Sequence, residues 1–160
     1  MKNVFTNLVV AISGSDASIL AAKYAIIMAK QYHCRLTAVY VVDTATLRQL
    51  VMTKIFVPSE GDEYEKSLEE NGKRYLTFVQ DLGKAKGVAV EADLKKGAVY
   101  TEILECAEER KADCIILGGW EQGRSPREII ALSHKEVIYN ASCPVLVVKE
   151  TMVDQLYKAL

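Results

Sequence analysis

Short apolar runs alternate along this chain with longer segments in which apolar residues recur every three or four positions. The runs are rich in aliphatic and β-branched residues, which predicts buried strands. The longer segments have the spacing of amphipathic helices, with one apolar stripe and one polar face. The predicted strands cover residues 8–12, 36–42, 88–94, 114–117 and 145–148, and the predicted helices cover 17–32, 62–86, 99–111 and 125–141.

Strands that alternate with helices predict an α/β fold, an open five-stranded parallel sheet with helices on both faces. We expect a single domain over residues 1–150, followed by a short, partly helical tail over 151–160. Residues 43–61 have no clean period and contain Pro58 and Gly61, so we expect a mobile excursion there, with some helix near 47–52.

The charge balance and the cysteines restrict the partners and the compartment. Lys and Arg number 20 against 21 acidic residues, and this balance disfavours nucleic acid and anionic membranes as partners. No apolar run reaches the ~20 residues of a membrane span. The four cysteines have no C-x-x-C spacing and lie in apolar segments, where reduced thiols pack as small hydrophobes. These features predict a cytoplasmic protein.

In open parallel sheets, ligands bind at the carboxyl ends of the strands, where the strand order reverses. Three segments follow strands in this way: residues 13–15, 41–43 and 118–125. The third holds three glycines and leads into a helix start with Ser125 as cap and Pro126 next, an arrangement that favours anions such as phosphate. The candidate binding residues are Ser13, Gly14, Ser15, Val41, Gly118, Gly119, Gly123, Arg124, Ser125 and Ser133.

The sequence offers little support for catalysis or for a metal centre. His33 and His134 are isolated, and no Cys/His cluster has metal-ligand spacing, so we predict neither catalytic residues nor a metal site. Ser133 and His134 are adjacent, but neighbouring helical side chains diverge by about 100° and do not face each other.

Over residues 4–149 the chain resembles the universal stress protein family. The resemblance rests on Val10–Ser15, on Tyr40–Asp43, on the glycine-bearing loop and on the closing Ala-Ser-Cys-Pro-Val-Leu-Val-Val at 141–148. It implies a Rossmann-like α/β domain that is commonly dimeric through its last strand, here Val145, Leu146, Val147 and Val148. Some members bind ATP between the first, second and fourth loops, and others do not.

The chain departs from the pattern of the ATP-binding members. Ser13 stands where they carry an aspartate, and Gly119 and Gly123 are separated by three residues instead of two. The place of their second Gly-Ser pair holds Ser133-His134 when counted from Gly123, or Ala131-Leu132 when counted back from Cys143. Losing two hydrogen bonds to charged groups weakens binding by about a hundredfold or more. Arg124 and Arg127 would compensate by pairing with phosphate.

Two functions therefore stay open. The leading hypothesis is a non-enzymatic stress-response or regulatory homodimer with a degenerate nucleotide pocket and a protein partner. The alternative is an ATP- or AMP-binding member with slow ATP hydrolysis or adenylyl transfer, for which Asp16, Asp43 and Glu121 are the available carboxylates.

Overall fold

The computed structural model describes residues 3–119, 129–149 and 151–160, and it contains the predicted five-stranded parallel sheet. The strand order is β3-β2-β1-β4-β5. β2 and β3 thus lie on one side of the central β1, and β4 and β5 lie on the other side. Leu8 of β1 stands beside Leu36 of β2 and Cys114 of β4. The strands are β1 (Asn7–Ile12), β2 (Arg35–Asp43), β3 (Val90–Gly97), β4 (Cys114–Gly118) and β5 (Val145–Val148).

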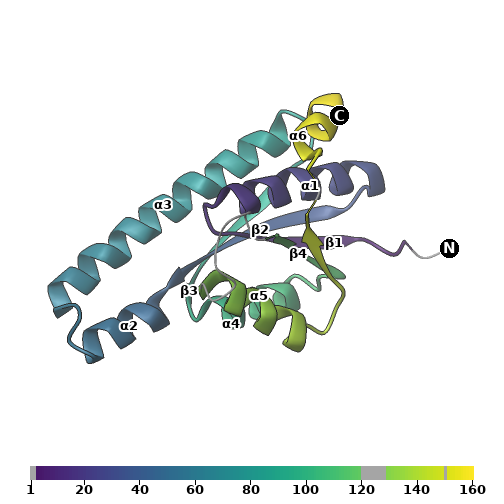
Figure 1. Ribbon diagram of the computed structural model, residues 1–160. Coiled ribbons are helices and arrows are strands. Elements are labelled where there is room, and N and C mark those ends of the chain that lie inside the picture. Colours follow the sequence, from purple (N-terminus) through teal and green to yellow (C-terminus); the bar gives the residue numbers. More distant parts are fainter. Residues whose placement is uncertain (1–2, 120–128, 150) are drawn as a thin grey trace.

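Helices cover both faces of the sheet, as the alternating pattern predicts. Figure 1 shows α1, α3 and α6 on one face and α4 and α5 on the other. The described helices are α1 (Asp16–Tyr32), α2 (Thr44–Met52), α3 (Pro58–Lys84), α4 (Val99–Glu109), α5 (Ile129–Asn140) and α6 (Val153–Ala159). Alternate strand residues point to the two faces, so Val10 and Ile116 pack with the first helix group and Val9 and Ile115 with the second.

Helix α1 begins and ends on short local signals. The Ser15 hydroxyl accepts a hydrogen bond from the Ser18 amide at 3.2 Å and so caps the first turn. His33, at a φ of 54°, ends the helix in the left-handed conformation. Ala21, Ala22 and Ala25 are fully buried, and their small side chains let α1 lie close to the sheet.

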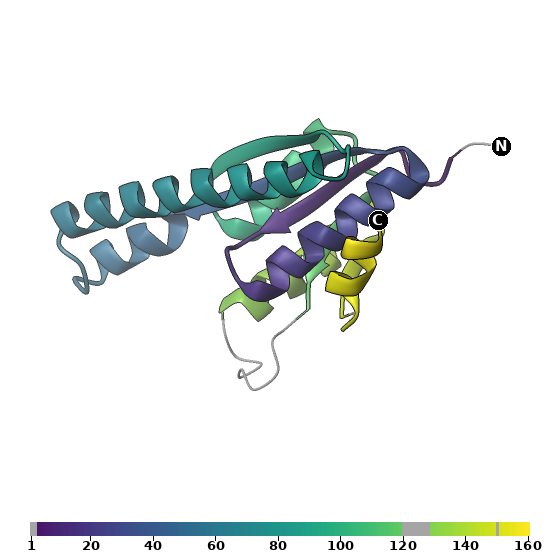
Figure 2. The ribbon, with the colours of Figure 1, turned by 90° about the horizontal axis from the view of Figure 1, so that it is seen from above.

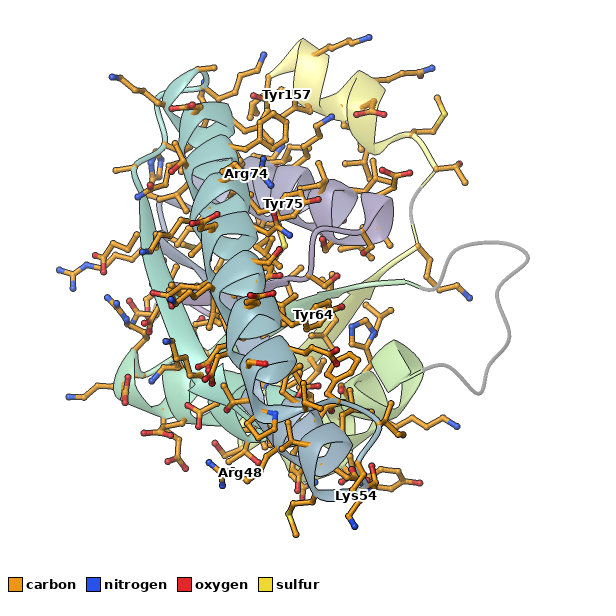
Figure 3. The ribbon with its side chains drawn as sticks, turned by 90° about the vertical axis from the view of Figure 1, so that its left-hand side faces the viewer. Arg48, Lys54, Tyr64, Arg74, Tyr75 and Tyr157 are labelled. Atoms are coloured by element: carbon orange, nitrogen blue, oxygen red, sulfur yellow. The ribbon has the colours of Figure 1, made fainter. Side chains whose placement is uncertain are left out.

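The prediction of some helix near residues 47–52 is confirmed, but the expectation of irregular structure was wrong for residues 44–46 and 58–61, which are helical as well. Asp43 caps α2, which covers Thr44–Met52, and α3 begins at Pro58, four residues earlier than predicted. Proline fits this first helical position because its missing N–H has no partner there in any helix. Figure 2 shows α2 and the first half of α3 extending beyond the sheet as a helical pair. In Figure 3, Arg48 and Lys54 lie at the α2 end of this pair and Tyr157 lies at the other end of α3.

The last residues form α6, which packs against α1. Val153 is fully buried in the core shared with α1. The Tyr157 hydroxyl donates to the carbonyl of Leu82 at 2.7 Å, and Lys86 Nζ lies 4.8 Å from the centre of the Tyr157 ring. The expectation of helix in the tail is confirmed, and this helix is anchored to the fold by buried and polar contacts.

Candidate functional site

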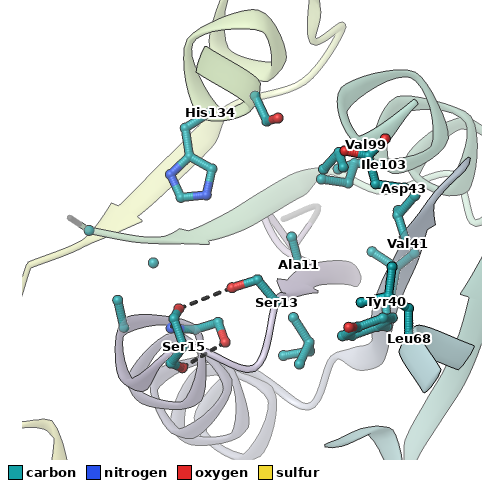
Figure 4. A pocket seen from close by; sticks show the side chains of 17 residues that line it. Ala11, Ser13, Ser15, Tyr40, Val41, Asp43, Leu68, Val99, Ile103 and His134 are labelled. Atoms are coloured by element: carbon teal, nitrogen blue, oxygen red, sulfur yellow. Dashed lines mark hydrogen bonds between the residues drawn. The ribbon is translucent and has the colours of Figure 1, made fainter. Parts of the chain in front are cut away.

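A cavity of about 210 Å³ opens at the carboxyl ends of β1, β2 and β4, where the strand order reverses. Its walls are mostly apolar, and hydroxyl groups and glycine backbone stand along one side. Figure 4 shows the cavity between α1 and α5. The described lining residues are Ala11, Ile12, Ser13, Ser15, Ala17, Ser18, Val39, Tyr40, Val41, Asp43, Leu68, Val99, Ile103, Gly118, Gly119, Ser133 and His134.

The structure brings six of the ten predicted binding residues to this cavity: Ser13, Ser15, Val41, Gly118, Gly119 and Ser133. Gly14 faces a neighbouring groove instead, beside Arg74 and Tyr75. Its φ is +83°, and a Cβ there would lie 2.5 Å from the Tyr75 ring, so the turn itself requires glycine. The other three predicted residues, Gly123, Arg124 and Ser125, lie outside the described residues.

Gly118 and Gly119 serve close packing of the backbone. A Cβ on Gly118 would lie 2.7 Å from the carbonyl carbon and oxygen of Ala17, in the first turn of α1. The Gly119 amide donates to the carbonyl of Val148 at 2.8 Å, so this N–H is already used within the fold. The two glycines therefore let β4, α1 and β5 pack closely at the edge of the cavity. This packing explains both glycines without a role in holding a phosphate.

Two serine hydroxyls form a short network at the start of α1. Ser13 Oγ lies 3.0 Å from Ser15 Oγ, and Ser15 also accepts from the Ser18 amide. A hydroxyl has one donor and two acceptor positions, so Ser13, which is exposed, retains capacity for a ligand. The pair supplies neutral hydrogen-bonding groups where an aspartate would supply a charge.

The carboxylate of Asp43, at the end of β2, accepts hydrogen bonds that hold the next helix in place. One carboxylate oxygen accepts from the Thr46 amide at 3.0 Å, and the other accepts from the Thr46 hydroxyl at 2.7 Å. Both bonds fix the N-terminus of α2. Asp43 therefore lines the cavity while each of its oxygens is engaged by Thr46, which holds the carboxylate in place.

Replacing Asp43 by alanine will lower the free energy of unfolding by about 1–2 kcal/mol, the usual cost of losing an N-cap. Asp43→Asn keeps a side-chain oxygen that accepts from the Thr46 amide, and it will lose only a small part of that stability. Urea denaturation of both variants checks this. Equal losses for Ala and Asn would show that the charge, and not the cap, matters.

His134 lies across the cavity from the serine pair, and Figure 4 shows its ring pointing into the cavity. Burial lowers the pKa of His134, because desolvation disfavours the charged imidazolium. The ring is therefore neutral at pH 7, with one donor and one acceptor nitrogen. Ser133 and His134 are adjacent on α5, and their side chains diverge, yet both residues line the cavity, because α5 forms one of its sides.

The comparison with known proteins identifies the family. The profile of the universal stress protein family matches residues 5–149. The chain belongs to the universal stress protein family. Universal stress protein MJ0531 of Methanocaldococcus jannaschii is 34% identical over 151 residues, which cover 93% of this chain and 85% of that relative. Universal stress protein YxiE of Bacillus subtilis is 30% identical over 149 residues, 91% of this chain and 100% of YxiE.

Solved universal stress proteins share the fold at lower sequence identity. UspA from Lactobacillus plantarum has a TM-score of 0.76 at 22% identity, covering 91% of this chain and 98% of that one. A universal stress protein in complex with cAMP has a TM-score of 0.62 at 21% identity, covering 90% of this chain and 96% of that one. One from Archaeoglobus fulgidus in complex with dAMP has a TM-score of 0.62 at 18% identity, covering 91% and 99%.

Sequence reasoning missed the apolar walls of the site in this universal stress protein. Val39, Leu68, Val99 and Ile103 have the periodic spacing of core residues, and nothing in that spacing distinguishes a residue that packs from one that lines a cavity. Tyr40 and His134 are missed as well. The signal for Tyr40 was its place beside Val41 at the end of a strand, and His134 had none.

The described part of this universal stress protein has neither a metal-ligand cluster nor a membrane-spanning helix. Within residues 3–119, 129–149 and 151–160, no group of three or more His, Cys, Asp or Glu side chains is arranged to hold a metal ion. Among the helices of the same residues, none combines the length and apolar character needed to cross a bilayer.

Proposed function

We propose that this universal stress protein is a non-enzymatic stress-response protein that binds an adenine nucleoside or its monophosphate in the cavity at the strand ends. The observation that carries the proposal is the cavity itself, an apolar slot with hydroxyls on one side at the point where the strand order reverses. The cAMP and dAMP complexes of proteins with the same fold support an adenine ligand.

The size of the cavity favours a small ligand. Its volume of about 210 Å³ is below the roughly 300–1,000 Å³ usual for small-molecule sites. The enclosed space therefore suits a planar base with part of its sugar, and a phosphate would extend toward Ser13 and the mouth. Ser13 in place of an aspartate supports a neutral contact there, which suits a weakly bound regulatory ligand.

The described lining residues do not support chemistry on the ligand. Asp43 supplies their only carboxylate, and both of its oxygens bond to Thr46. The hydroxyls of Ser13 and Ser15 bond to each other, and no general base within the described residues bonds to either. An activated nucleophile needs such a base, and a magnesium site usually takes one or two carboxylates, of which these residues offer only one, already engaged by Thr46. These contacts favour binding without turnover.

Calorimetric titration with adenosine, AMP, cAMP and ATP, with and without Mg²⁺, tests this proposal. We expect saturable binding of AMP or adenosine, with ATP no tighter and no product by chromatography after prolonged incubation. Ser133→Phe fills the cavity and will abolish binding, whereas Lys135→Phe, at an exposed position outside it, will not. The absence of a binding heat with every adenine compound contradicts the binding proposal. Formation of product contradicts the proposal that the protein is not an enzyme.

We further propose that the protein forms a homodimer in the cytoplasm by pairing β5 with its two-fold copy. Both edges of the sheet are open to pairing, but they differ in chemistry. The β3 edge carries Glu91, Asp93, Lys95 and Lys96, and such charges discourage association. The β5 edge is Val-Leu-Val-Val, and its first three residues are only partly buried. An uncharged edge of this kind favours self-pairing.

All four cysteines are free thiols, which supports a reducing compartment.

The hydrogen bonds of β5 suggest a specific test. Ile115 donates to Pro144 and Gly119 donates to Val148, so the even-numbered residues of this strand bond to β4. In a parallel pair the odd-numbered residues then direct their N–H outward. Val147→Pro removes one outward donor and leaves the β4 ladder intact, so we expect a folded monomer by sedimentation. Val147→Thr keeps the donor and will stay dimeric. A wild-type monomer at tens of micromolar contradicts the proposal.

A further inference from the structure

Tyr40, at the end of β2, holds a polar group inside the otherwise apolar part of the cavity. Its side chain is only 6% exposed, and it lines the cavity beside Val39 and Val41. Figure 4 shows the ring lying at the inner wall with its hydroxyl directed into the cavity. The hydroxyl has no hydrogen-bond partner among the described residues. Its oxygen is not among the buried atoms that lack a partner, so the hydroxyl reaches the space of the cavity and is free to donate to a ligand there.

The surroundings hold the ring of Tyr40 in one position. Gly72 of α3 has no side chain, and the ring of Tyr40 occupies the space beside it. A Cβ at position 72 would lie 2.6 Å from Cδ1 of that ring. Tyr75, one turn further along α3, stacks on the ring with centroids 6.3 Å apart and planes at 15°. Leu94 of β3 borders the same space at Gly72. The hydroxyl is thus preorganised by residues that do not themselves line the cavity.

The state of this hydroxyl determines which ligand atom it suits. Burial raises the pKa of Tyr40, and the neighbouring Tyr75 and Tyr64 hydroxyls raise it further. The group therefore stays protonated at every physiological pH and offers its hydrogen to an acceptor. The apolar walls around it favour a flat ring, so the acceptor belongs to the edge of that ring.

We propose that Tyr40 determines ligand specificity by donating a hydrogen bond from its hydroxyl to a ring nitrogen at the buried edge of a purine base. The inference rests on the proposed adenine-binding function and names the group that selects the base. A ring that presents C–H at that edge leaves the hydroxyl unpaired and binds more weakly. Phenylalanine at this position would fill the same space without that selectivity.

The test compares Tyr40→Phe with Tyr75→Phe, which removes a hydroxyl from the stacked ring outside the cavity. We expect Tyr40→Phe to bind AMP about three- to tenfold more weakly, the usual effect of losing one neutral hydrogen bond, and Tyr75→Phe to bind normally. AMP analogues in which the nitrogen at position 1, 3 or 7 is replaced by C–H identify the acceptor. One of them will bind equally to the wild type and to Tyr40→Phe.

A measurement without ligand separates this role from a structural one. Since the hydroxyl has no partner in the free protein, Tyr40→Phe will leave the thermal midpoint unchanged or raise it. Wild-type binding of AMP with equal binding by Tyr40→Phe overturns the inference and leaves the proposed function standing. A lower midpoint for free Tyr40→Phe overturns it too, because the hydroxyl then has a structural partner. Failure of the wild type to bind any purine compound overturns both.

Discussion

Replacing Gly118 by valine will destabilise the protein by about 3 kcal/mol or more, the upper range for overpacking a tight site. Gly118 is buried at the end of β4, where a Cβ would lie 2.7 Å from the backbone of Ala17 and 3.0 Å from the Ser18 amide nitrogen. These are backbone atoms of a capped helix, so they move only if α1 shifts. Strand propensity alone favours valine here, and the steric cost exceeds that preference. Urea denaturation measures the loss.

Gly87→Ala is a control for the general effect of replacing a glycine. Gly87 has a φ of +73°, and a Cβ there meets nothing within 4 Å, so only backbone strain opposes alanine. We expect a loss of about 1–2 kcal/mol from that strain, and no change at the cavity. Gly118→Val will also weaken ligand binding because it displaces the start of α1. A Gly118→Val variant no less stable than Gly87→Ala would contradict the close packing described.

Replacing Val153 by aspartate will release α6 and lower stability by about 2–4 kcal/mol, as severe point substitutions do. Val153 is fully buried against the α1 side of the core, where an ionised carboxylate would lose its hydration. Undocking a seven-residue helix avoids burying the charge, and so short a helix is not stable by itself. The loss is therefore limited to the free energy with which α6 docks.

The same substitution at Leu156, which is 45% exposed on the same helix, is the matched control. Leu156→Asp will change stability by less than about 1 kcal/mol, because a surface charge stays hydrated. Thermal denaturation and limited proteolysis after residue 150 distinguish the two variants. Rapid cleavage is expected only for Val153→Asp. If both variants resist cleavage equally, α6 does not depend on Val153 for its position.

Local signals in the sequence predicted most of the elements. Uncharged aliphatic runs indicated β1, β4 and β5, and Ser15 marked the start of α1. The prediction for residues 43–61 was only partly right: the helix near 47–52 was expected, but the helix cap and the later helix start were interpreted as irregular structure. Asp43 is a cap and Pro58 begins a helix, but a single proline and a glycine in a polar segment are equally typical of loops.

The candidate site was only partly predictable for a different reason. Residues that follow strands are visible in the sequence, and four residues chosen on that basis, Ser13, Ser15, Val41 and Gly118, line the cavity. His134 reaches it from α5, more than a hundred residues from Ser13, and no spacing rule connects the two. The neighbouring Gly14 was assigned to the ligand, but its conformation and the Tyr75 ring account for it.

The sequence by itself determined the fold class, the family and the edge of the sheet at which the cavity lies. It did so because hydrophobic periodicity and strand ends are local properties. Only the tertiary structure decided what each polar group near that edge is free to do. Asp43 and the Gly119 amide are occupied within the fold, whereas the Tyr40 hydroxyl faces the cavity and has no hydrogen-bond partner among the described residues. Hydrogen-bond satisfaction depends on atoms that come from distant elements, so it is settled only when helices and strands have packed.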